Sequence, residues 1–247
     1  MKIFVTGGSR GIGRRIVTMA LERGHDVAFT YNSSNDGHIK QLLDEAKKIA
    51  PNQLCKGYQL NVRNVEDVVR VTDQVIDDFD TIDTVINNAA INKNNLAFNM
   101  TDEEWHDVID TNLNGPFYIT RQFLQVFLAN RKGHFVYVSS IAKDGISGQA
   151  NYSASKAGLV GLSGTIAKEY GVKGITSNVV VPGMFETDMV KETLSSNLRK
   201  FWLQHNPMKR MGQLDELAEV ALFLGSDAAS FVNGQVISVT GGLDWAE

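Results

Sequence analysis

Short apolar runs rich in valine, isoleucine and phenylalanine alternate with stretches of helical periodicity along the whole chain. The runs are Lys2–Thr6, Asp26–Tyr31, Tyr58–Val62, Thr84–Asn87, His134–Ser139, Ser177–Val181 and Val236–Thr240. They are nearly continuous in apolar residues and bounded by Gly, Asn or Pro, which is typical of strands buried on both faces of a parallel sheet. Strand–helix alternation from end to end predicts one α/β domain over residues 1–247, a doubly wound sheet of about seven strands with helices on both faces.

The first helical stretch shows the pattern clearly. Ile12, Ile16, Met19 and Ala20 recur at helical spacing, and Gly24 stands where a glycine commonly follows the end of a helix. The alternation is interrupted only at 187–213, an apolar and basic segment that follows the turn at Pro182 and contains Pro207. Ligands of such sheets bind beyond the carboxyl ends of the strands, so we expect this segment to act as a substrate lid.

A glycine-rich turn, Thr6–Gly13, follows the first strand. Gly7, Gly11 and Gly13 permit a tight turn and let a pyrophosphate approach the backbone, while the next helix directs its N-terminal N–H groups at the phosphates. The spacing fits neither G-x-G-x-x-G nor a P-loop, because no Gly-Lys-Ser/Thr closes it. Its place between the first strand and the first helix nevertheless favours a Rossmann-type dinucleotide site.

The end of the second strand bears on the choice between NAD and NADP. An acidic residue there would bind the ribose 2′-hydroxyl and repel a 2′-phosphate. Asn32 and Ser33 are neutral, and Arg10 in the glycine-rich turn is a candidate partner for the phosphate, although Asp36 lies close by in the chain. The sequence therefore predicts NADP(H).

Tyr152 and Lys156 are four residues apart in a helical stretch, so both can serve one site. An ammonium group near a phenol lowers the phenol's pKa, and a tyrosine tuned in this way can donate a proton near neutral pH. Ser140 follows the fifth strand and could bind a carbonyl oxygen there. A tyrosine and a lysine at this spacing, taken alone, more often simply lie on the surface of a helix.

Composition narrows the class of protein further. The net charge is −4, from 24 basic and 28 acidic residues, which argues against non-specific nucleic-acid binding. Cys55 is the single cysteine, so an internal disulfide is excluded. The sequence shows no signal segment and no apolar run of the roughly 18–20 residues needed to span a bilayer, which predicts a cytoplasmic protein. The five histidines show no metal-ligand spacing, so we expect no metal.

Taken in order, the motifs resemble those of short-chain dehydrogenases/reductases along essentially the whole chain. The matching pieces are Thr6–Gly13, Asn87–Ala90, Asn112, Ser139–Ser140, Tyr152–Lys156 and Pro182–Thr187. The segments Gly148–Tyr152, Glu186–Met189 and Asn233–Gly242 are most similar to bacterial 3-oxoacyl-(acyl-carrier-protein) reductases. The resemblance implies NADPH-dependent reduction of a β-ketoacyl thioester to its 3-hydroxy form, in fatty-acid or polyketide and polyene-type biosynthesis.

The same resemblance implies a role for each matching residue. Tyr152 would donate the proton, Lys156 would lower its pKa and bind the nicotinamide ribose, Ser140 would orient the carbonyl, and Asn112 would hold a water in a proton relay. The implied cofactor contacts are Gly7, Ser9, Arg10, Gly11, Ile12, Gly13, Asn32, Ser33, Asn61, Val62, Asn88, Ala89, Ala90, Tyr152, Lys156, Pro182, Gly183, Phe185 and Thr187.

Three departures from the family pattern matter. Ala90 replaces a glycine and requires a negative φ there. Asn61 replaces an acid at the adenine contact, but its amide oxygen can still accept a hydrogen bond. Strand alignment selects Ser140 as the carbonyl-orienting serine, whereas counting back from Tyr152 selects Ser139. Side chains alternate along a strand, so only one serine can face the site, and we predict Ser140.

An acidic acyl carrier protein would need basic groups at the rim of the cleft. Arg131 and Lys173 match positions implicated in the family, and they could equally be ordinary helix-end cations. The lid segment adds Lys191, Arg199, Lys200, Lys209 and Arg210. The family also implies a homotetramer built through the helices around Asn112 and Tyr152.

Two other functions remain open at this point. The same site could reduce an acyl-CoA or an unrelated ketone, because the substrate is determined by the residues of the binding pocket and not by the fold. The chain could also be a dinucleotide-sensing protein without turnover, although such a protein need not keep a proton donor such as Tyr152.

Overall fold

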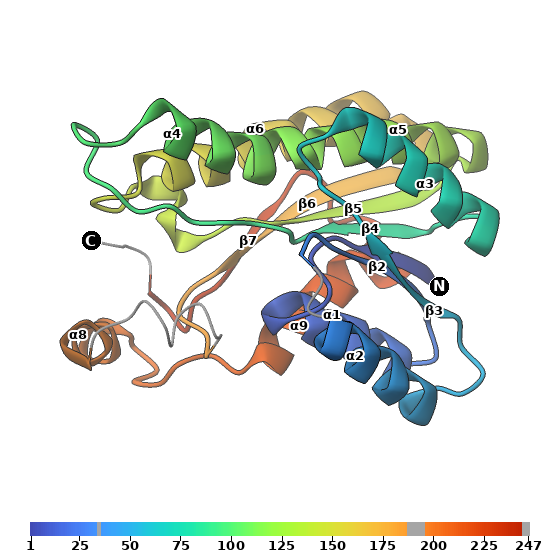
Figure 1. Ribbon diagram of the computed structural model, residues 1–247, viewed down its shortest axis with the longest axis horizontal. Coiled ribbons are helices and arrows are strands. Elements are labelled where there is room, and N and C mark those ends of the chain that lie inside the picture. The colour runs from blue at the N-terminus through green and yellow to red at the C-terminus, as the bar shows by residue number, and fades with distance from the viewer. Residues whose placement is uncertain (34–35, 187–195, 244–247) are drawn as a thin grey trace.

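The computed structural model describes residues 1–33, 36–186 and 196–243, which form a parallel sheet covered by helices on both faces (Figure 1). The strands are β1 (Lys2–Val5), β2 (Asp26–Tyr31), β3 (Cys55–Gln59), β4 (Thr84–Asn87), β5 (Gly133–Val138), β6 (Ile175–Pro182) and β7 (Val236–Val239). Their order is β3-β2-β1-β4-β5-β6-β7, and every neighbouring pair is parallel. The predicted doubly wound sheet is confirmed.

The helices divide between the two faces of the sheet. They are α1 (Gly11–Glu22), α2 (Asp36–Ile49), α3 (Val65–Phe79), α4 (Asp102–Ile109), α5 (Gly115–Asn130), α6 (Ala150–Tyr170), α8 (Ser196–His205) and α9 (Leu214–Leu224). Shorter helical turns are η1 (Asp110–Asn114), η2 (Ile141–Asp144), η3 (Gly171–Lys173) and η4 (Asp227–Ala229). α1, α2 and α9 cover one face, and α3, α5 and α6 cover the other (Figure 1).

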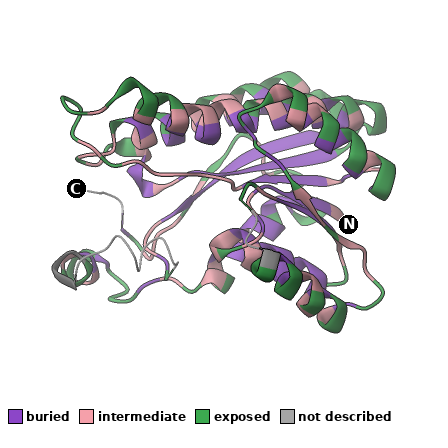
Figure 2. Ribbon diagram, in the orientation of Figure 1, coloured by how far each residue is buried: buried purple, intermediate pink, exposed green. Residues whose placement is uncertain are grey.

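Two apolar cores result from this layering, one on each side of the sheet. Strand residues contribute to them alternately, so that Val5 and Ile86 face α1 while Phe4 and Val85 face α3 and α5. The strands are accordingly buried along most of their length (Figure 2). This explains the nearly continuous apolar runs, because both faces of each central strand are covered.

The edge strand β3 is where the sequence patterns placed the boundaries least well. The third run was predicted at Tyr58–Val62, but β3 spans Cys55–Gln59, with Cys55 paired to Val27. β3 lies at the edge and is only partly buried, so its residues carry no continuous apolar signal. The first helix fits its prediction: α1 ends at Glu22, and Gly24 has the positive φ of 75° expected after a helix end.

The chain order reverses between β1 and β4, because β1 leads outward to β2 and β4 lies on its other side. Loops that leave β1 and β4 therefore diverge and open a crevice at the carboxyl ends of these strands, where ligands of such sheets bind. The predicted lid lies at the same edge. Its part 187–195 is outside the described residues, and the rest forms α8 and the turn that leads to α9.

Candidate active site

The glycine-rich turn after β1 is packed so closely that its glycines are required. Gly7 and Gly11 have φ values of +64° and +53°, which L side chains rarely adopt. A Cβ on Gly13 would lie 2.2 Å from the carbonyl oxygen of Gly7. The Nδ2 of Asn88 donates to the carbonyls of Thr6 and Gly7 at 3.0 and 3.1 Å, which fixes the turn against β4.

The turn delivers the N-terminus of α1 to the crevice. Arg10 is the N-cap residue, is exposed, and makes no side-chain cap hydrogen bond to the helix. Ser9 and Ile12 are half-buried, and a Cβ on Gly11 would meet nothing within 4 Å. The first N–H groups of α1 are therefore not capped by the Arg10 side chain, and the space beside Gly11 is open, which fits a pyrophosphate group.

Residues predicted to contact the adenosine end lie around the ends of β2 and β3. Asn32 and Ser33 are exposed just after β2, and no carboxylate stands at these positions. The Oδ1 of Asn61 accepts a hydrogen bond from the N–H of Arg63 at 3.2 Å, so part of its acceptor capacity is already used. Val62 is 6% exposed and packs against the start of α5.

Residues predicted near the nicotinamide follow β4 and β6. The N–H of Ala89 donates to Thr6 Oγ1 at 3.0 Å. Ala90 is not among the described non-glycine residues with positive φ, so the alanine fits where the family has glycine. Pro182 ends β6, and a Cβ on Gly183 would lie 2.9 Å from Thr240 Cα.

Two predicted contacts complete this side. The Phe185 side chain is 4% exposed, and Phe185 forms a parallel bridge with Gly212, which ties the strand end to the turn after α8. Thr187 lies outside the described residues. All described cofactor-site predictions therefore cluster at the carboxyl edge of the sheet, and the glycine-rich cradle fits a dinucleotide.

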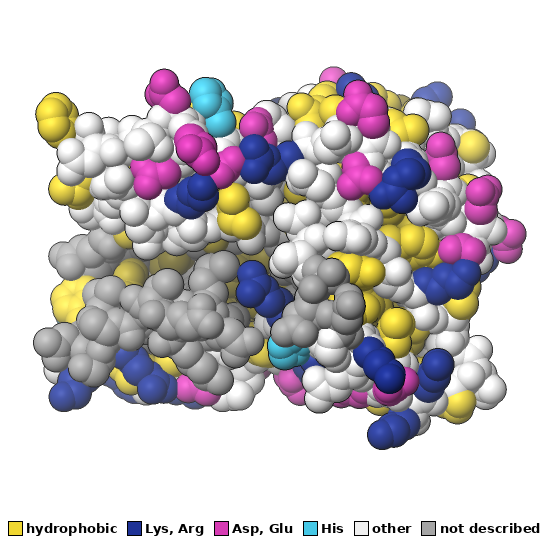
Figure 3. Space-filling model, viewed as in Figure 1, with side chains coloured by type: hydrophobic (Ala, Val, Ile, Leu, Met, Phe, Trp, Pro, Cys, Tyr) yellow, Lys and Arg dark blue, Asp and Glu magenta, His cyan; other side chains and the backbone are white. Residues whose placement is uncertain are grey.

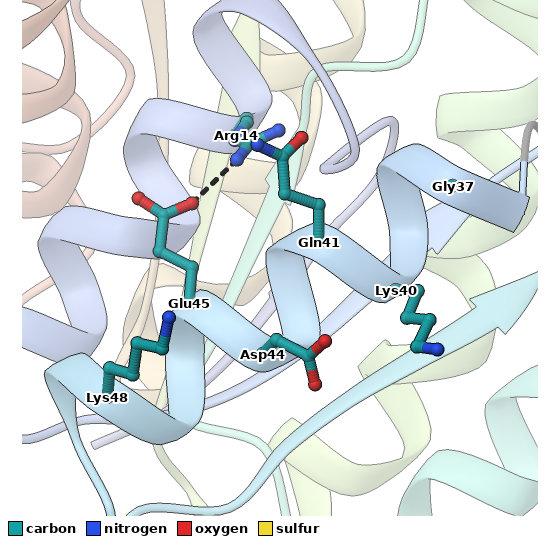
Figure 4. Close-up of a pocket in the computed structure, with 7 residues that line it drawn as sticks. All are labelled: Arg14, Gly37, Lys40, Gln41, Asp44, Glu45 and Lys48. Atoms are coloured by element: carbon teal, nitrogen blue, oxygen red, sulfur yellow. Dashed lines mark hydrogen bonds and ion pairs between the residues drawn. The ribbon is translucent and has the colours of Figure 1, made fainter.

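A separate groove lies between α1 and α2 (Figure 4). It is lined by Arg14, Gly37, Lys40, Gln41, Asp44, Glu45 and Lys48. Arg14 Nη2 and Glu45 Oε2 are 2.6 Å apart across it. None of the predicted site residues lines this groove, and its mixed charges are typical of a solvated helix surface.

The two adjacent serines after β5 point in different directions. Ser139 is 2% exposed, and its Oγ donates to the carbonyl oxygen of Lys156 at 2.8 Å. Ser140 is half-buried, accepts a hydrogen bond from the N–H of Ala142 at 3.1 Å, and lies close enough to Tyr152 to lower the pKa of that tyrosine. The structure therefore brings Ser140, rather than Ser139, to the tyrosine.

Tyr152 and Lys156 lie one turn apart near the start of α6. The Lys156 side chain is buried, and its Nζ donates to the carbonyl oxygen of Val138 at 2.8 Å. The same Nζ lies 5.6 Å from the centroid of the Tyr152 ring. Ser140, Tyr152 and Lys156 thus form one cluster at the carboxyl end of β5.

The protonation of this pair differs from the sequence-based expectation. Burial raises the pKa of Tyr152, and the hydrogen bond with Ser140 offsets only part of that rise. Burial also lowers the pKa of Lys156 to about 7. Lys156 is not among the groups that shift the Tyr152 pKa, since its Nζ hydrogen-bonds to the carbonyl of Val138, and a lowering of this pKa by the lysine stays a prediction.

Asn112 lies in a π-helical turn, η1, and is fully buried. Its Oδ1 accepts from the N–H of Ile91 at 2.9 Å, and its Nδ2 donates to the Ile91 carbonyl and to Ser155 Oγ at 2.9 and 3.2 Å. The side chain is thus committed to protein partners. Pro116 has no N–H, so the carbonyl of Asn112 lacks its regular α-helical donor, and a water would bind this atom in preference to the amide.

Asn151 carries a contact that the sequence patterns did not reveal. It is fully buried, and its Oδ1 accepts a hydrogen bond from the backbone N–H of Tyr152 at 2.7 Å. Its Nδ2 donates to the carbonyls of Lys93 and Glu104 at 3.1 and 3.0 Å. An Asn at the start of a predicted helix is a recognisable capping signal, but only the fold shows that it joins the tyrosine to α4.

The two cations expected at the cleft rim are on the other side of the molecule. Arg131 and Lys173 immediately precede β5 and β6, whereas Ser140 follows β5. Residues before a parallel strand lie at its amino end, about 20 Å from the carboxyl end for strands of six residues. Placing Arg131 and Lys173 at the rim of the same chain's cleft is therefore wrong.

Other classes of site find no support in the described part of the chain. None of its helices is long and apolar enough to cross a membrane. Over the same residues, His, Cys, Asp and Glu side chains do not gather in threes as they would around a metal ion.

Known proteins match this chain over nearly its full length. A family model described as enoyl-(acyl carrier protein) reductase matches residues 7–244. The 3-oxoacyl-(acyl-carrier-protein) reductase FabG of Staphylococcus epidermidis is 39% identical over 240 residues, 97% of each chain. The protein of the same name from Salmonella typhimurium is 38% identical over 97% of this chain and 95% of its own. The crystal structure of levodione reductase superposes with a TM-score of 0.92 at 31% identity, covering 98% of this chain and 96% of that chain. With its doubly wound sheet, glycine-rich turn and serine–tyrosine–lysine cluster, this chain belongs to the short-chain dehydrogenase/reductase family.

Proposed function

We propose that this protein reduces the ketone of a β-ketoacyl thioester carried on acyl carrier protein, with NADPH as the reductant. The observation that carries the proposal is the cluster of Ser140, Tyr152 and Lys156 at the carboxyl end of β5, beside the glycine-rich cradle. The names of the similar FabG proteins supply the substrate class. The product would be the 3-hydroxyacyl thioester.

The chain's residues suit a proton donor to a reduced carbonyl. Ser140 lies close enough to Tyr152 to lower the pKa of the tyrosine, so both hydroxyls can turn to the same carbonyl oxygen. Bound NADPH would supply the hydride. Tyr152 would then give its proton to the oxygen, and its raised pKa keeps it protonated at neutral pH. An alkoxide is far more basic than a phenolate, so a raised tyrosine pKa does not prevent the transfer.

Lys156 and Asn112 would return the proton. Lys156 has a pKa of about 7, so it exchanges protons readily near neutral pH. A water on the Asn112 carbonyl would connect that lysine to solvent. This route uses the main chain of Asn112, since the amide is occupied by Ile91 and Ser155.

We propose NADP(H) rather than NAD(H) from the polar groups at the end of β2. Asn32 and Ser33 are neutral and exposed, and Arg10 is exposed at the N-terminus of α1. A guanidinium at this place can bind a 2′-phosphate in two hydrogen bonds. Asn32 and Ser33 carry no carboxylate, so nothing at these two positions would repel that phosphate.

A homotetramer and a cytoplasmic location stay predictions. On α5, Phe123 and Phe127 are buried in the core, whereas Phe117 is 43% and Leu128 37% exposed and so available to a second copy. A second copy packed there could also carry Arg131 or Lys173 toward a neighbouring cleft. Within one chain these two cations lie at the amino end of the sheet, away from Ser140 and Tyr152.

The direct test is an NADPH-oxidation assay with an acetoacetyl thioester. We expect turnover by the parent protein, and in the Tyr152→Phe variant a loss of about 10²–10⁴-fold in kcat with NADPH binding retained. Phenylalanine keeps the ring and removes only the hydroxyl, so it is the matched control. NADPH binding without turnover on a panel of ketones would instead identify a dinucleotide sensor.

A further inference from the structure

The two sides of the substrate crevice carry opposite charge. Between Ser196 and Gly212, the chain has four Lys and Arg residues and no carboxylate. Between Thr101 and Ile109, it has four Asp and Glu residues and no Lys or Arg. Figure 3 shows acidic side chains over α4 at the upper left, with basic ones among them where Arg63 and Lys93 pair with Asp107, and mostly basic ones along the lower left, over α8. In a chain of net charge −4, the positive segment is a local exception.

We name the four cations Arg199, Lys200, Lys209 and Arg210 the basic rim. α8 carries the first two, and the turn after α8 carries the others. The helix is anchored beside the catalytic cluster, because Trp202 is 6% exposed and packs with Ile141, the residue directly after Ser140. Asn206 Nδ2 also donates to the Thr240 carbonyl at 3.0 Å, at the end of β7. The rim therefore lies at the carboxyl edge of the sheet.

The cations of the basic rim are accessible to a partner. All four residues are exposed. Arg199 pairs with Glu186 at 2.8 Å and Arg210 with Glu216 at 2.5 Å, but all four side chains in these pairs are 42–53% exposed. Such exposed pairs are weak and can exchange partners. Two carboxylates against four cations leave an excess of positive charge.

Lys209 stands out within the rim. Its φ is 55°, in the left-handed region where glycine or asparagine is usual. Its Nζ donates to the carbonyl of Gln204 at 2.5 Å, which holds the ammonium at the C-terminal end of α8. Met208 beside it is 55% exposed and offers apolar contact. A charged turn with an exposed methionine at its centre is suited to a protein partner of opposite charge.

We propose that the basic rim is the docking surface for the acidic carrier protein, within the same chain as the site it serves. This inference rests on the proposed function for its substrate class. Docking on α8 would place the thioester arm beside Ile141 and so within reach of Ser140 and Tyr152. The exposed carboxylates Asp102 and Glu103 of α4 would repel the same partner and so orient it toward α8.

The test compares carrier-bound and small thioester substrates of the same acyl group. In the Lys200→Glu/Lys209→Glu variant, we expect the ratio of the two kcat/KM values, carrier-bound over small, to fall about tenfold or more at low salt, and the deficit to shrink at high salt. The control is Lys47→Glu/Lys48→Glu at the end of α2, which changes the net charge equally. Its ratio should stay within about twofold of the parent.

The milder pair Lys200→Gln/Lys209→Gln guards against misfolding and should lower the ratio in the same direction. An unchanged ratio in both rim variants, or an equal fall in the α2 control, would overturn the docking surface. A fall confined to Arg131→Glu/Lys173→Glu would also overturn it, in favour of docking across two copies. Failure of the parent protein to reduce even the small thioester would instead refute the proposed function.

Discussion

The hydroxyl of Ser139 donates to the main-chain carbonyl of Lys156 at 2.8 Å, deep inside the protein. This bond joins the end of β5 to the second turn of α6, so Ser139 is part of the scaffold that holds the helix carrying Tyr152. Its neighbour Ser140 is left to face the tyrosine. Two adjacent serines thus take different tasks because side chains alternate along a strand.

The first prediction separates these two tasks. Ser140→Ala should lower kcat by about 10²-fold, because it removes a hydroxyl aimed at the reacting oxygen, and should also cost stability, because Ser140 Oγ caps η2 through the N–H of Ala142. Ser139→Ala should keep turnover within about tenfold and lower the free energy of unfolding by about 1 kcal/mol, the usual value of a buried hydrogen bond. Steady-state kinetics and urea unfolding of both variants decide the matter. A reversed pattern would make Ser139 the carbonyl-binding residue.

The second prediction concerns Lys156, whose burial lowers its pKa from 10.5 to about 7. Between these values the unfolded chain binds a proton that the folded protein does not. Stability from this group must therefore rise with pH across that range and is lowest below it. From pH 7.5 to 9.5 the gain should be about 2–3 kcal/mol relative to a variant without the amine.

Lys156→Met is the comparison, because methionine fills similar volume without a titratable group. Urea unfolding of both proteins at the two pH values isolates the contribution of Lys156. The parent protein should become more stable relative to the variant as the pH rises. A constant difference would mean that the buried amine keeps an ordinary pKa.

The third prediction tests the preference for NADPH over NADH with variants of two arginines near the start of α1. Arg10→Ala should lower kcat/KM for NADPH by about tenfold or more and leave NADH nearly unaffected, because only NADPH carries the 2′-phosphate. Arg14, one turn later on α1, is the matched control since it is ion-paired to Glu45 at 2.6 Å. Arg14→Ala should change both coenzymes alike. An unchanged NADPH/NADH ratio in Arg10→Ala would contradict the assigned role.

Features of the fold and of the site could be predicted from the sequence where they depend on residues close together in the chain. The places of the central strands, the end of α1 just before Gly24 and the proximity of Tyr152 to Lys156 follow from periodicity and spacing within a few residues. The position of β3 could not be predicted in this way, because this edge strand is only partly buried and so lacks a continuous apolar pattern. The direction of the Tyr152 pKa shift could not be predicted either, because burial, its main cause, depends on how the whole chain packs around the helix, not on the lysine four residues away.

The location of Arg131 and Lys173 likewise depends on the tertiary fold and could not be predicted from the sequence. Their match to positions implicated in the family suggested the rim of the cleft, and the parallel sheet places them at its other end. The basic rim could be suspected from the charges in 196–212, but its closeness to Ser140 depends on Trp202 packing against Ile141. Contacts of that kind exist only after the chain has folded.

The last prediction concerns Asn151, which we expect to be a positioning residue for Tyr152. Its Oδ1 binds the Tyr152 N–H, and its Nδ2 holds two carbonyls at Lys93 and Glu104. Asn151→Ala should lower stability by about 2–3 kcal/mol, since it leaves several buried groups unpaired. It should also lower kcat by about tenfold more than it changes KM, because the tyrosine loses its fixed orientation while the cofactor cradle stays intact.

Asn151→Asp tests the two halves of this contact separately. A carboxylate keeps an acceptor for the Tyr152 N–H but has no donor for the carbonyls of Lys93 and Glu104. We therefore expect kcat closer to that of the parent than in Asn151→Ala, with stability still reduced. If both variants lose stability while kcat per folded molecule stays at the parent value, Asn151 serves only the fold, and the orientation of Tyr152 is set elsewhere, by Ser139 and the packing of α6 on β6.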